Sequence, residues 1–282
     1  TASAIKNVCV SDDGSFLYIT SSTDHAVMVF SRNTGTGLLT PSAVVSNGVG
    51  GVAGITGASS LVLSPDNRFL YVSGQTANSV AVFSRNAGTG ALTYIGKVTQ
   101  GDPGITSLSG ARSLAVSPDG KILYVSAIAS NSITAFSRDD TTGLLTLDTV
   151  ATHGVGGVDG LRSVSGMMAD AQSRNLYAAG QTDAAVAVFR LPAPSVTVSS
   201  VAVLSYSSGA PALVIDNALT VDDPFSATLA SARISVSAGF VAGDVLSVTT
   251  SGAVTSSYDN ATGVLTLSGT DTLSAYQAVL RA

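Results

Sequence analysis

Apolar and polar residues alternate along most of the chain in short runs separated by turn-forming residues. The segment 112–151 shows this clearly, with apolar-rich runs at 114–116, 121–127, 133–137 and 144–149. Alternation over so few residues predicts β-strands. The Ser-Pro-Asp-Gly sequence at 117–120 suits a turn, because Pro presets φ and Gly tolerates positive φ. No helical period extends over ten residues, so the pattern predicts an all-β fold.

This unit recurs every 53 residues. Two aromatic positions repeat four times each, at Tyr18, Tyr71, Tyr124 and Tyr177 and at Phe30, Phe83, Phe136 and Phe189. Four short strands in about 50 residues are typical of a β-propeller blade, which buries its faces by stacking on neighbouring blades. We therefore predict four four-stranded antiparallel blades over residues 1–191, with these aromatic side chains forming the core between blades.

The repeats also resemble a known family. The segments 64–93 (SPDNRFLYVSGQTANSVAVFSRNAGTGALT) and 117–146 (SPDGKILYVSAIASNSITAFSRDDTTGLLT) are similar to YVTN-type, lactonase-like β-propeller repeats of bacterial surface proteins. The resemblance covers about residues 4–191. It implies the fold, whereas propellers serve as enzymes, binding modules and scaffolds alike.

The pattern changes after residue 191. Pro192, Ala193 and Pro194 form a predicted linker, and the repeat is absent from 195–282. Alternating runs continue at 196–206, 212–221, 232–236, 245–250 and 264–268, which predicts a second all-β domain, an Ig/cadherin-like β-sandwich. The words LVIDNALTVDDP and YDNATGVLTLSGTDTLSAYQAVLRA resemble bacterial cadherin-like modules of large adhesins.

Both predicted domains look incomplete. The fourth repeat has no clear fourth strand, and cadherin-like modules normally continue beyond the sequence seen here. Either the chain is a fragment, or a partner supplies strands; residues 197–204 could instead complete the fourth blade. Unpaired edges at 264–268 or 273–280 would accept strands from another copy, because an open edge presents unsatisfied backbone groups.

Composition excludes several classes of protein. A net charge of −5 and only three lysines leave no basic patch for nucleic acid. The single cysteine, Cys9, excludes an internal disulfide, and no apolar run reaches the length of a membrane span. A lysine-poor chain rich in Ser, Thr, Gly, Ala and Val favours an extracellular or cell-surface location.

The polar residues that could form a site lie on or beside the Gly-rich segments 48–57, 101–110 and 154–160. These segments connect successive blades and are therefore expected to share one rim of the propeller. Polar residues on or beside them that differ between repeats form the predicted ligand site: Asp102, Arg112, His153, Asp159 and Arg162. His25 shares its repeat position with Asn78 and Asn131, which indicates a turn residue. No catalytic residue is assigned.

The acidic residues of the second predicted domain could supply oxygen ligands for calcium. Asp222 and Asp223 would be its first ligands, since Ca²⁺ prefers carboxylate oxygens and the cadherin-like resemblance implies calcium at domain junctions.

Scarce catalytic residue types predict a non-enzymatic extracellular protein, a segment of an adhesin or a subunit of a surface fibre. It would associate through β-edges and propeller-rim contacts with further copies, with neighbouring modules of a longer chain, or with a surface glycan or protein. The alternative is a lactonase-like hydrolase or a glycan-binding propeller that uses the Gly-rich rim loops. A chain without tryptophan fits glycan stacking poorly. The sequence identifies neither the ligand nor the full number of blades.

Overall fold

The structure is a computed structural model that describes residues 3–170, 175–190, 195–198, 212–222, 228–236, 240–241 and 243–281. Contacts within the chain define two compact units, Thr1–Leu191 and Pro192–Ala282. Within the described residues, no helix has both the length and the apolar character needed to cross a membrane.

The first unit consists of antiparallel sheets, each running in simple sequence order. Blade 1 contains β1 (Ile5–Val10), β2 (Phe16–Ser21), β3 (Ala26–Arg32) and β4 (Leu39–Ser46). Blade 2 contains β5 (Ala58–Leu63), β6 (Phe69–Gly74), β7 (Ser79–Arg85) and β8 (Leu92–Thr99). Blade 3 contains β9 (Ala111–Val116), β10 (Ile122–Ala127), β11 (Ser132–Arg138) and β12 (Leu145–Thr152). Blade 4 contains β13 (Val164–Ala169), β14 (Asn175–Gly180) and β15 (Ala185–Arg190).

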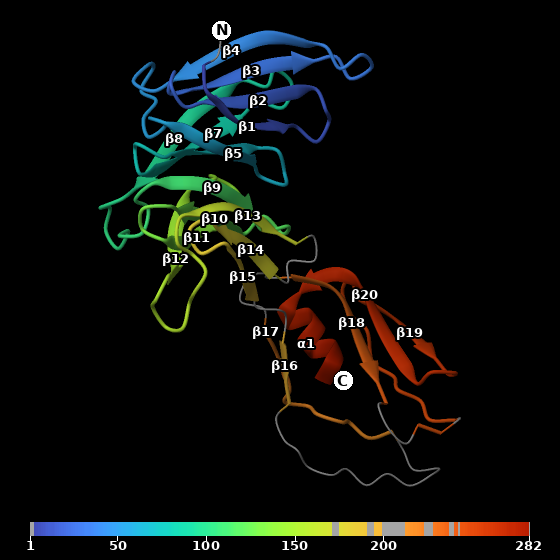
Figure 1. Ribbon diagram of the computed structural model, residues 1–282. Coiled ribbons are helices and arrows are strands. Elements are labelled where there is room, and N and C mark those ends of the chain that lie inside the picture. The colour runs from blue at the N-terminus through green and yellow to red at the C-terminus, as the bar shows by residue number, and fades with distance from the viewer. Residues whose placement is uncertain are drawn as a thin grey trace. The chain divides into compact units, whose positions relative to one another are not determined.

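The blades stack in order, and the first strand of each lies against the first strand of the next. Figure 1 shows the result, an arc with blade 1 at one end and blade 4 at the other. The prediction of an all-β chain with four-stranded antiparallel sheets is confirmed for three blades, and blade 4 has three strands among the described residues. These blades do not close a ring.

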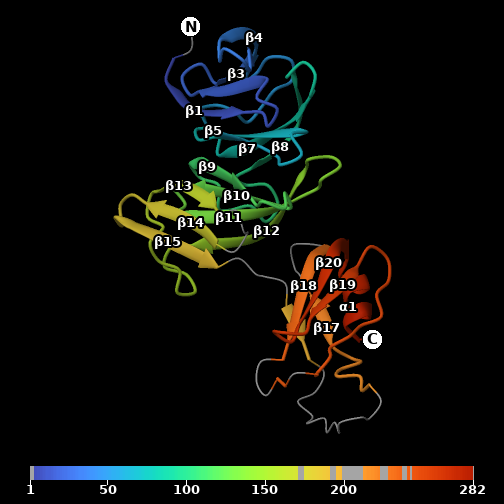
Figure 2. The ribbon, with the colours of Figure 1, turned by 90° about the vertical axis from the view of Figure 1, so that its right-hand side faces the viewer.

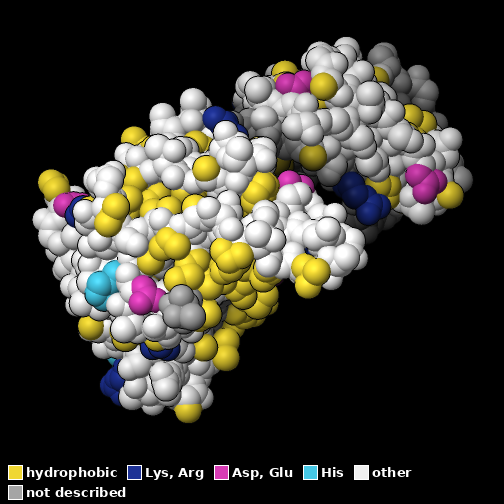
Figure 3. Space-filling view, turned by 90° about the horizontal axis from the view of Figure 1, so that it is seen from above, with side chains coloured by type: hydrophobic (Ala, Val, Ile, Leu, Met, Phe, Trp, Pro, Cys, Tyr) yellow, Lys and Arg dark blue, Asp and Glu magenta, His cyan; other side chains and the backbone are white. Residues whose placement is uncertain are grey.

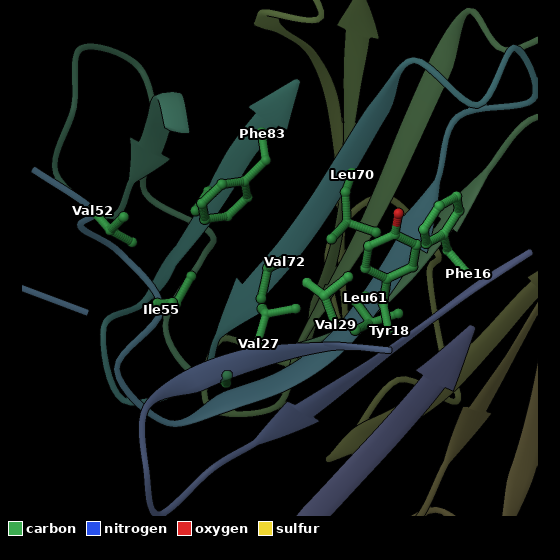
Figure 4. Close-up of a cluster of buried hydrophobic side chains, with 12 residues drawn as sticks. Phe16, Tyr18, Val27, Val29, Val52, Ile55, Leu61, Leu70, Val72 and Phe83 are labelled. Atoms are coloured by element: carbon green, nitrogen blue, oxygen red, sulfur yellow. The ribbon is translucent and has the colours of Figure 1, made fainter. Parts of the chain in front are cut away.

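Aromatic side chains fill the spaces between blades. Figure 4 shows Phe16 and Tyr18 of blade 1 beside Leu70 of blade 2. The Tyr18 hydroxyl donates to the carbonyl of Gly90 in blade 2 (3.0 Å), and the Tyr71 hydroxyl makes the same bond to Gly143 in blade 3 (2.9 Å). A buried hydroxyl needs such a partner. The repeated bond therefore fixes the register between neighbouring blades.

Glycine is required where these tyrosines dock. Gly90 and Gly143 both have positive φ (69° and 74°). A Cβ at Gly90 would collide with the Phe16 ring, and one at Gly143 with the Phe69 ring. The glycine repeated at this position thus permits the close approach of each blade to the one before it.

A second contact, which we call the latch, joins each blade to the next through a side chain in one blade and a backbone N–H in the following blade. His25, Asn78 and Asn131 occupy the turn between the second and third strands with φ between 50° and 53°. Their side chains accept hydrogen bonds from main-chain N–H groups of the following blade: Gly57 to His25 Nδ1 (3.0 Å), Gly110 to Asn78 Oδ1 (2.7 Å) and Ser163 to Asn131 Oδ1 (2.9 Å). His25 is therefore a turn residue, as its repeat position predicts.

The repeated aromatic residues differ in burial. Tyr18, Tyr71, Tyr124, Phe83 and Phe136 are buried, whereas Phe30 and Phe189 are partly exposed. Tyr177 lies on the exposed face of blade 4. The prediction that all eight belong to the core between blades therefore does not hold for Tyr177, because no described blade covers that face.

The second unit has two sheets in its described part. β16 (Ser195–Thr197) pairs with β17 (Thr220–Asp222), and a three-stranded sheet has the order β18 (Thr228–Ser235), β20 (Val264–Thr272), β19 (Thr255–Asp259). Helix α1 (Leu273–Arg281) packs against this sheet, as Figure 2 shows, with Tyr276 and Val279 contributing to a core that contains Leu265 and Leu267. The described residues thus do not form the predicted Ig/cadherin-like sandwich.

Three predictions for this unit are wrong. Residues 245–250 form no strand, and the proposed free edge at 264–268 belongs to the central strand, paired on both sides. Residues 273–280 are helical because Thr272 caps the helix: its Oγ1 accepts from the Ala275 N–H (3.1 Å). Of the segment 197–204, residues 199–204 lie outside the described residues, and Thr197 pairs with Thr220 in this unit.

Candidate functional site

His153 stands where the other repeats have a structural side-chain amide. Its equivalents are Asn47 and Gln100, each of which accepts a hydrogen bond from the backbone N–H eight residues on, within its own Gly-rich loop (3.2 and 2.7 Å). The backbone of His153 is held as in the other repeats, with its N–H donating to the Asn131 carbonyl (2.9 Å). Its imidazole, in contrast, faces two carboxylates. A residue that gives up the local structural pattern marks a candidate functional position.

The two carboxylates come from different segments. Asp159 lies in the loop between β12 and β13, and Asp183 lies in the turn between β14 and β15. His153 Nδ1 is 3.2 Å from Asp159 Oδ1 and 3.7 Å from Asp183 Oδ2. Nδ1 is buried and makes no hydrogen bond of good geometry within the described residues. The ring nitrogen is therefore close to both acids without being committed to either.

Arg162 completes the group. Its backbone N–H donates to Asp183 Oδ2 (2.7 Å), and its guanidinium Nη1 is 3.7 Å from Asp183 Oδ1. The backbone contact repeats that of Ser3 with Asp24 in blade 1 (2.8 Å). Blade architecture therefore positions Asp183, while the exposed Arg162 side chain adds a positive charge at the solvent side of the cluster.

The cluster, which we call the rim cluster (His153, Asp159, Arg162 and Asp183), has two chemical capacities. Histidine beside a carboxylate can accept and return a proton, because the acid orients the ring and stabilises the imidazolium. The ligand atoms of His153, Asp159 and Asp183 also lie within 4.8 Å of one another, so the same three residues could hold a metal ion.

The structure brings together three of the five residues predicted for the rim site. His153, Asp159 and Arg162 meet, whereas Asp102 accepts from the Thr99 N–H in its own turn (2.7 Å). Arg112 lies at β9, where its carbonyl accepts from Ser73 Oγ (2.7 Å). Among the described polar contacts, neither residue reaches the rim cluster.

Asp183 was missed. Its repeat position is occupied by Asp24, Ala77 and Ser130 in the other blades, and this variation was the available signal. The calcium prediction stays a prediction: Asp222 ends β17, and Asp223 lies outside the described residues.

Comparison with known proteins places the repeats in a family. The sequence profile described as "Lactonase, 7-bladed beta-propeller" matches residues 6–158, just over half of the chain. A 6-phosphogluconolactonase of Formosa agariphila is 40% identical over 86 residues, which are 29% of this chain and 22% of that protein.

Solved structures show the same fold. A candidate 6-phosphogluconolactonase from Bacteroides uniformis is 21% identical with a TM-score of 0.55, over 66% of this chain and 50% of that one. A protein from Lactobacillus plantarum is 18% identical with a TM-score of 0.52, over 66% of this chain and 57% of that one. The chain therefore spans about half the length of these structures and about a fifth of the curated relative.

These findings correct the functional prediction. The prediction of a non-enzymatic adhesin segment or fibre subunit is contradicted by the match to the lactonase profile. It is also contradicted by the 40% sequence identity, over 86 residues, with a 6-phosphogluconolactonase. The adhesive, fibre-forming and cadherin-like description is therefore wrong. Catalytic residue types are scarce in this chain, but that composition does not exclude an enzyme, because a binding or active site needs only a few well-placed polar side chains.

Proposed function

The chain belongs to the lactonase family of seven-bladed β-propellers, and on this premise we propose that it is a lactonase-like hydrolase that acts at the rim cluster. The observation that carries the proposal is the approach of His153 Nδ1 to two carboxylates, 3.2 Å from Asp159 and 3.7 Å from Asp183. This arrangement supplies a general base on the rim where the blade-connecting loops meet.

The proposed reaction opens a cyclic ester with water. Water adds to the carbonyl carbon, the ring C–O bond breaks, the leaving oxygen takes a proton, and the product is a hydroxy acid. With its proton on Nδ1, toward the carboxylates, His153 would use Nε2 to take a proton from the attacking water and return it to the leaving oxygen. Asp159 and Asp183 would stabilise the imidazolium formed in between.

Arg162 suggests the substrate class. An exposed guanidinium beside the base suits an anionic group, because its planar donors pair with phosphate or carboxylate oxygens. The name of the Formosa agariphila relative points in the same direction, to a phosphorylated sugar lactone. We therefore propose a sugar lactone bearing a negative charge. An extracellular or cell-surface location stays a prediction from composition.

The test is continuous titration of the acid released from a lactone. The purified chain is mixed with 6-phosphogluconolactone or with unphosphorylated gluconolactone, and the spontaneous rate is subtracted. We expect acceleration of both substrates and a lower KM for the phosphorylated one. Replacing Arg162 with Gln should remove that preference while leaving the unphosphorylated substrate nearly unaffected. The proposed function is refuted if neither lactone opens faster in the presence of the chain than it does spontaneously.

A further inference from the structure

Three side chains of the rim cluster have the composition and spacing of a metal site. The ligand atoms of His153, Asp159 and Asp183 lie within 4.8 Å of one another, and within the part of the chain that the structure describes no other group of three or more His, Cys, Asp or Glu residues converges in this way. The chain has only two histidines, and charged residues make up 11% of it. Figure 3 shows the same scarcity on one face, where charged and His side chains form small, separate groups.

The distances from the ring nitrogen suit ligands of a single ion. Zn²⁺ forms bonds of about 2.1 Å to imidazole nitrogen and carboxylate oxygen in a tetrahedral arrangement, which places two ligand atoms about 3.4 Å apart. His153 Nδ1 is 3.2 Å from Asp159 Oδ1 and 3.7 Å from Asp183 Oδ2. The Asp159 side chain is 87% exposed, so its carboxylate is free to rotate toward an ion held by the other two residues.

The orientation of the imidazole points to the same occupant. His153 Nδ1 is buried and makes no hydrogen bond of good geometry within the described residues, although a carboxylate oxygen lies 3.2 Å away. A buried polar atom without a partner is rare and calls for a ligand or a water. In a metal site the ion lies along the lone pair of the ring nitrogen, so the ligand atoms are close to one another without being hydrogen-bonded.

Asp183 is held as a metal-bound carboxylate is held. Its side chain is 13% exposed, and its Oδ2 accepts the backbone N–H of Arg162 (2.7 Å). Such outer hydrogen bonds orient the carboxylates that bind metals. The two carboxylates of the rim cluster balance the charge of a divalent cation, whereas the guanidinium of Arg162, 3.7 Å from Asp183 Oδ1, opposes it. Arg162 therefore lowers the affinity of the site for a cation.

We propose that His153, Asp159 and Asp183 bind one divalent transition-metal ion of the zinc type, with water as the fourth ligand. An imidazole ligand favours Zn²⁺ over Ca²⁺, which takes about six to eight oxygen ligands. The ion takes the lone pair of Nδ1, so the ring proton moves to Nε2 and the ring no longer accepts a proton there. The proposed general base is thus a property of the metal-free chain. Metal binding is measured without a lactone, which makes this proposal independent of the proposed lactonase activity.

The test is isothermal titration calorimetry of the untagged whole chain, freed of metal with EDTA and dialysed, with Zn²⁺ as the probe. We expect one ion per chain and much weaker binding of Ca²⁺. His153→Asn, which installs the residue that blade 1 has at this position, should weaken Zn²⁺ binding by about 100-fold or more, because loss of an outer hydrogen bond alone costs about 10–100-fold. His25→Asn, the matched change at the other histidine, should bind Zn²⁺ like the wild type.

Two further variants test the geometry. Asp183→Asn keeps an acceptor for the Arg162 N–H but removes the charged ligand, so it should also weaken Zn²⁺ binding, whereas Arg162→Gln should tighten it. The rise in melting temperature caused by Zn²⁺ should follow the same order, and melts without metal establish that each variant is folded. A wild-type chain that binds no Zn²⁺ would overturn the proposal, as would binding that His153→Asn or Asp183→Asn leaves unchanged. Binding of Ca²⁺ as tight as that of Zn²⁺ would overturn the role of the imidazole as a ligand.

Discussion

Tyr71 and Tyr177 occupy the same position of the 53-residue repeat, on the second strand of blades 2 and 4. Tyr71 is fully buried and bonded to Gly143 of the next blade, whereas Tyr177 is 37% exposed. The local sequences around them, Phe-Leu-Tyr-Val and Asn-Leu-Tyr-Ala, predict the same strand. What differs is the neighbouring blade, so contacts between repeats decide the energetic role of a repeated residue.

The largest effect should come from truncating this pair. Tyr71→Ala removes a buried ring and its hydrogen bond, and should lower the free energy of unfolding by about 3–5 kcal/mol. Tyr177→Ala, on the exposed face, should cost less than about 1 kcal/mol. Denaturant unfolding of both variants measures the difference. Equal losses would mean that blade 4 has a cover resembling that of blade 2.

A smaller difference in stability is expected between Ala variants at two equivalent glycines. Gly37 and Gly143 share a repeat position and nearly the same φ (76° and 74°), but a Cβ at Gly143 meets the Phe69 ring while one at Gly37 meets nothing within 4 Å. Both Ala variants carry the cost of positive φ. Gly143→Ala should therefore lose about 1–3 kcal/mol more stability than Gly37→Ala, through overpacking alone. A thermal shift of the same size in both would contradict the account of the interface between blades.

The third predicted effect is a loss of folding stability that is absent at neutral pH and appears only at alkaline pH. Burial raises the pKa of Tyr71 and of Tyr124 to about 12, against a usual value of about 10. The unfolded chain therefore loses these protons first, and stability should fall as pH rises from about 10 toward 12. Denaturant unfolding at successive pH values measures this, and Tyr71→Phe should show a shallower fall. A stability that stays constant over that range would contradict the buried environment.

The fold of the first unit was predictable because the 53-residue register places each residue type in one structural role, as with His25, Asn78 and Asn131. Burial was not predictable from the same register, since Tyr177 repeats the sequence without repeating the neighbour. Helix α1 was not predicted because it has only nine residues, too few to show a helical pattern of apolar residues over ten positions. Thr272, which caps the helix, was the one local signal for it.

The rim site was partly predictable for a similar reason. His153 and Arg162 differ from their repeat equivalents and lie on a connecting loop, which singled them out. Asp183 lies 21 residues beyond Arg162, in a turn between two other strands, and only folding brings the two together. Asp102 and Arg112 share the same kind of position along the chain but are held in separate contacts.

The most direct test of the account compares the two histidines of the chain in the lactone titration. His25→Asn installs the residue that blades 2 and 3 use at the latch, so the account predicts activity equal to that of the wild type. His153→Asn installs the residue that blade 1 uses at the loop, and should reduce kcat by about 100-fold or more, the usual contribution of a general base. Full activity in His153→Asn, or equal losses in both variants, would contradict a catalytic rim cluster.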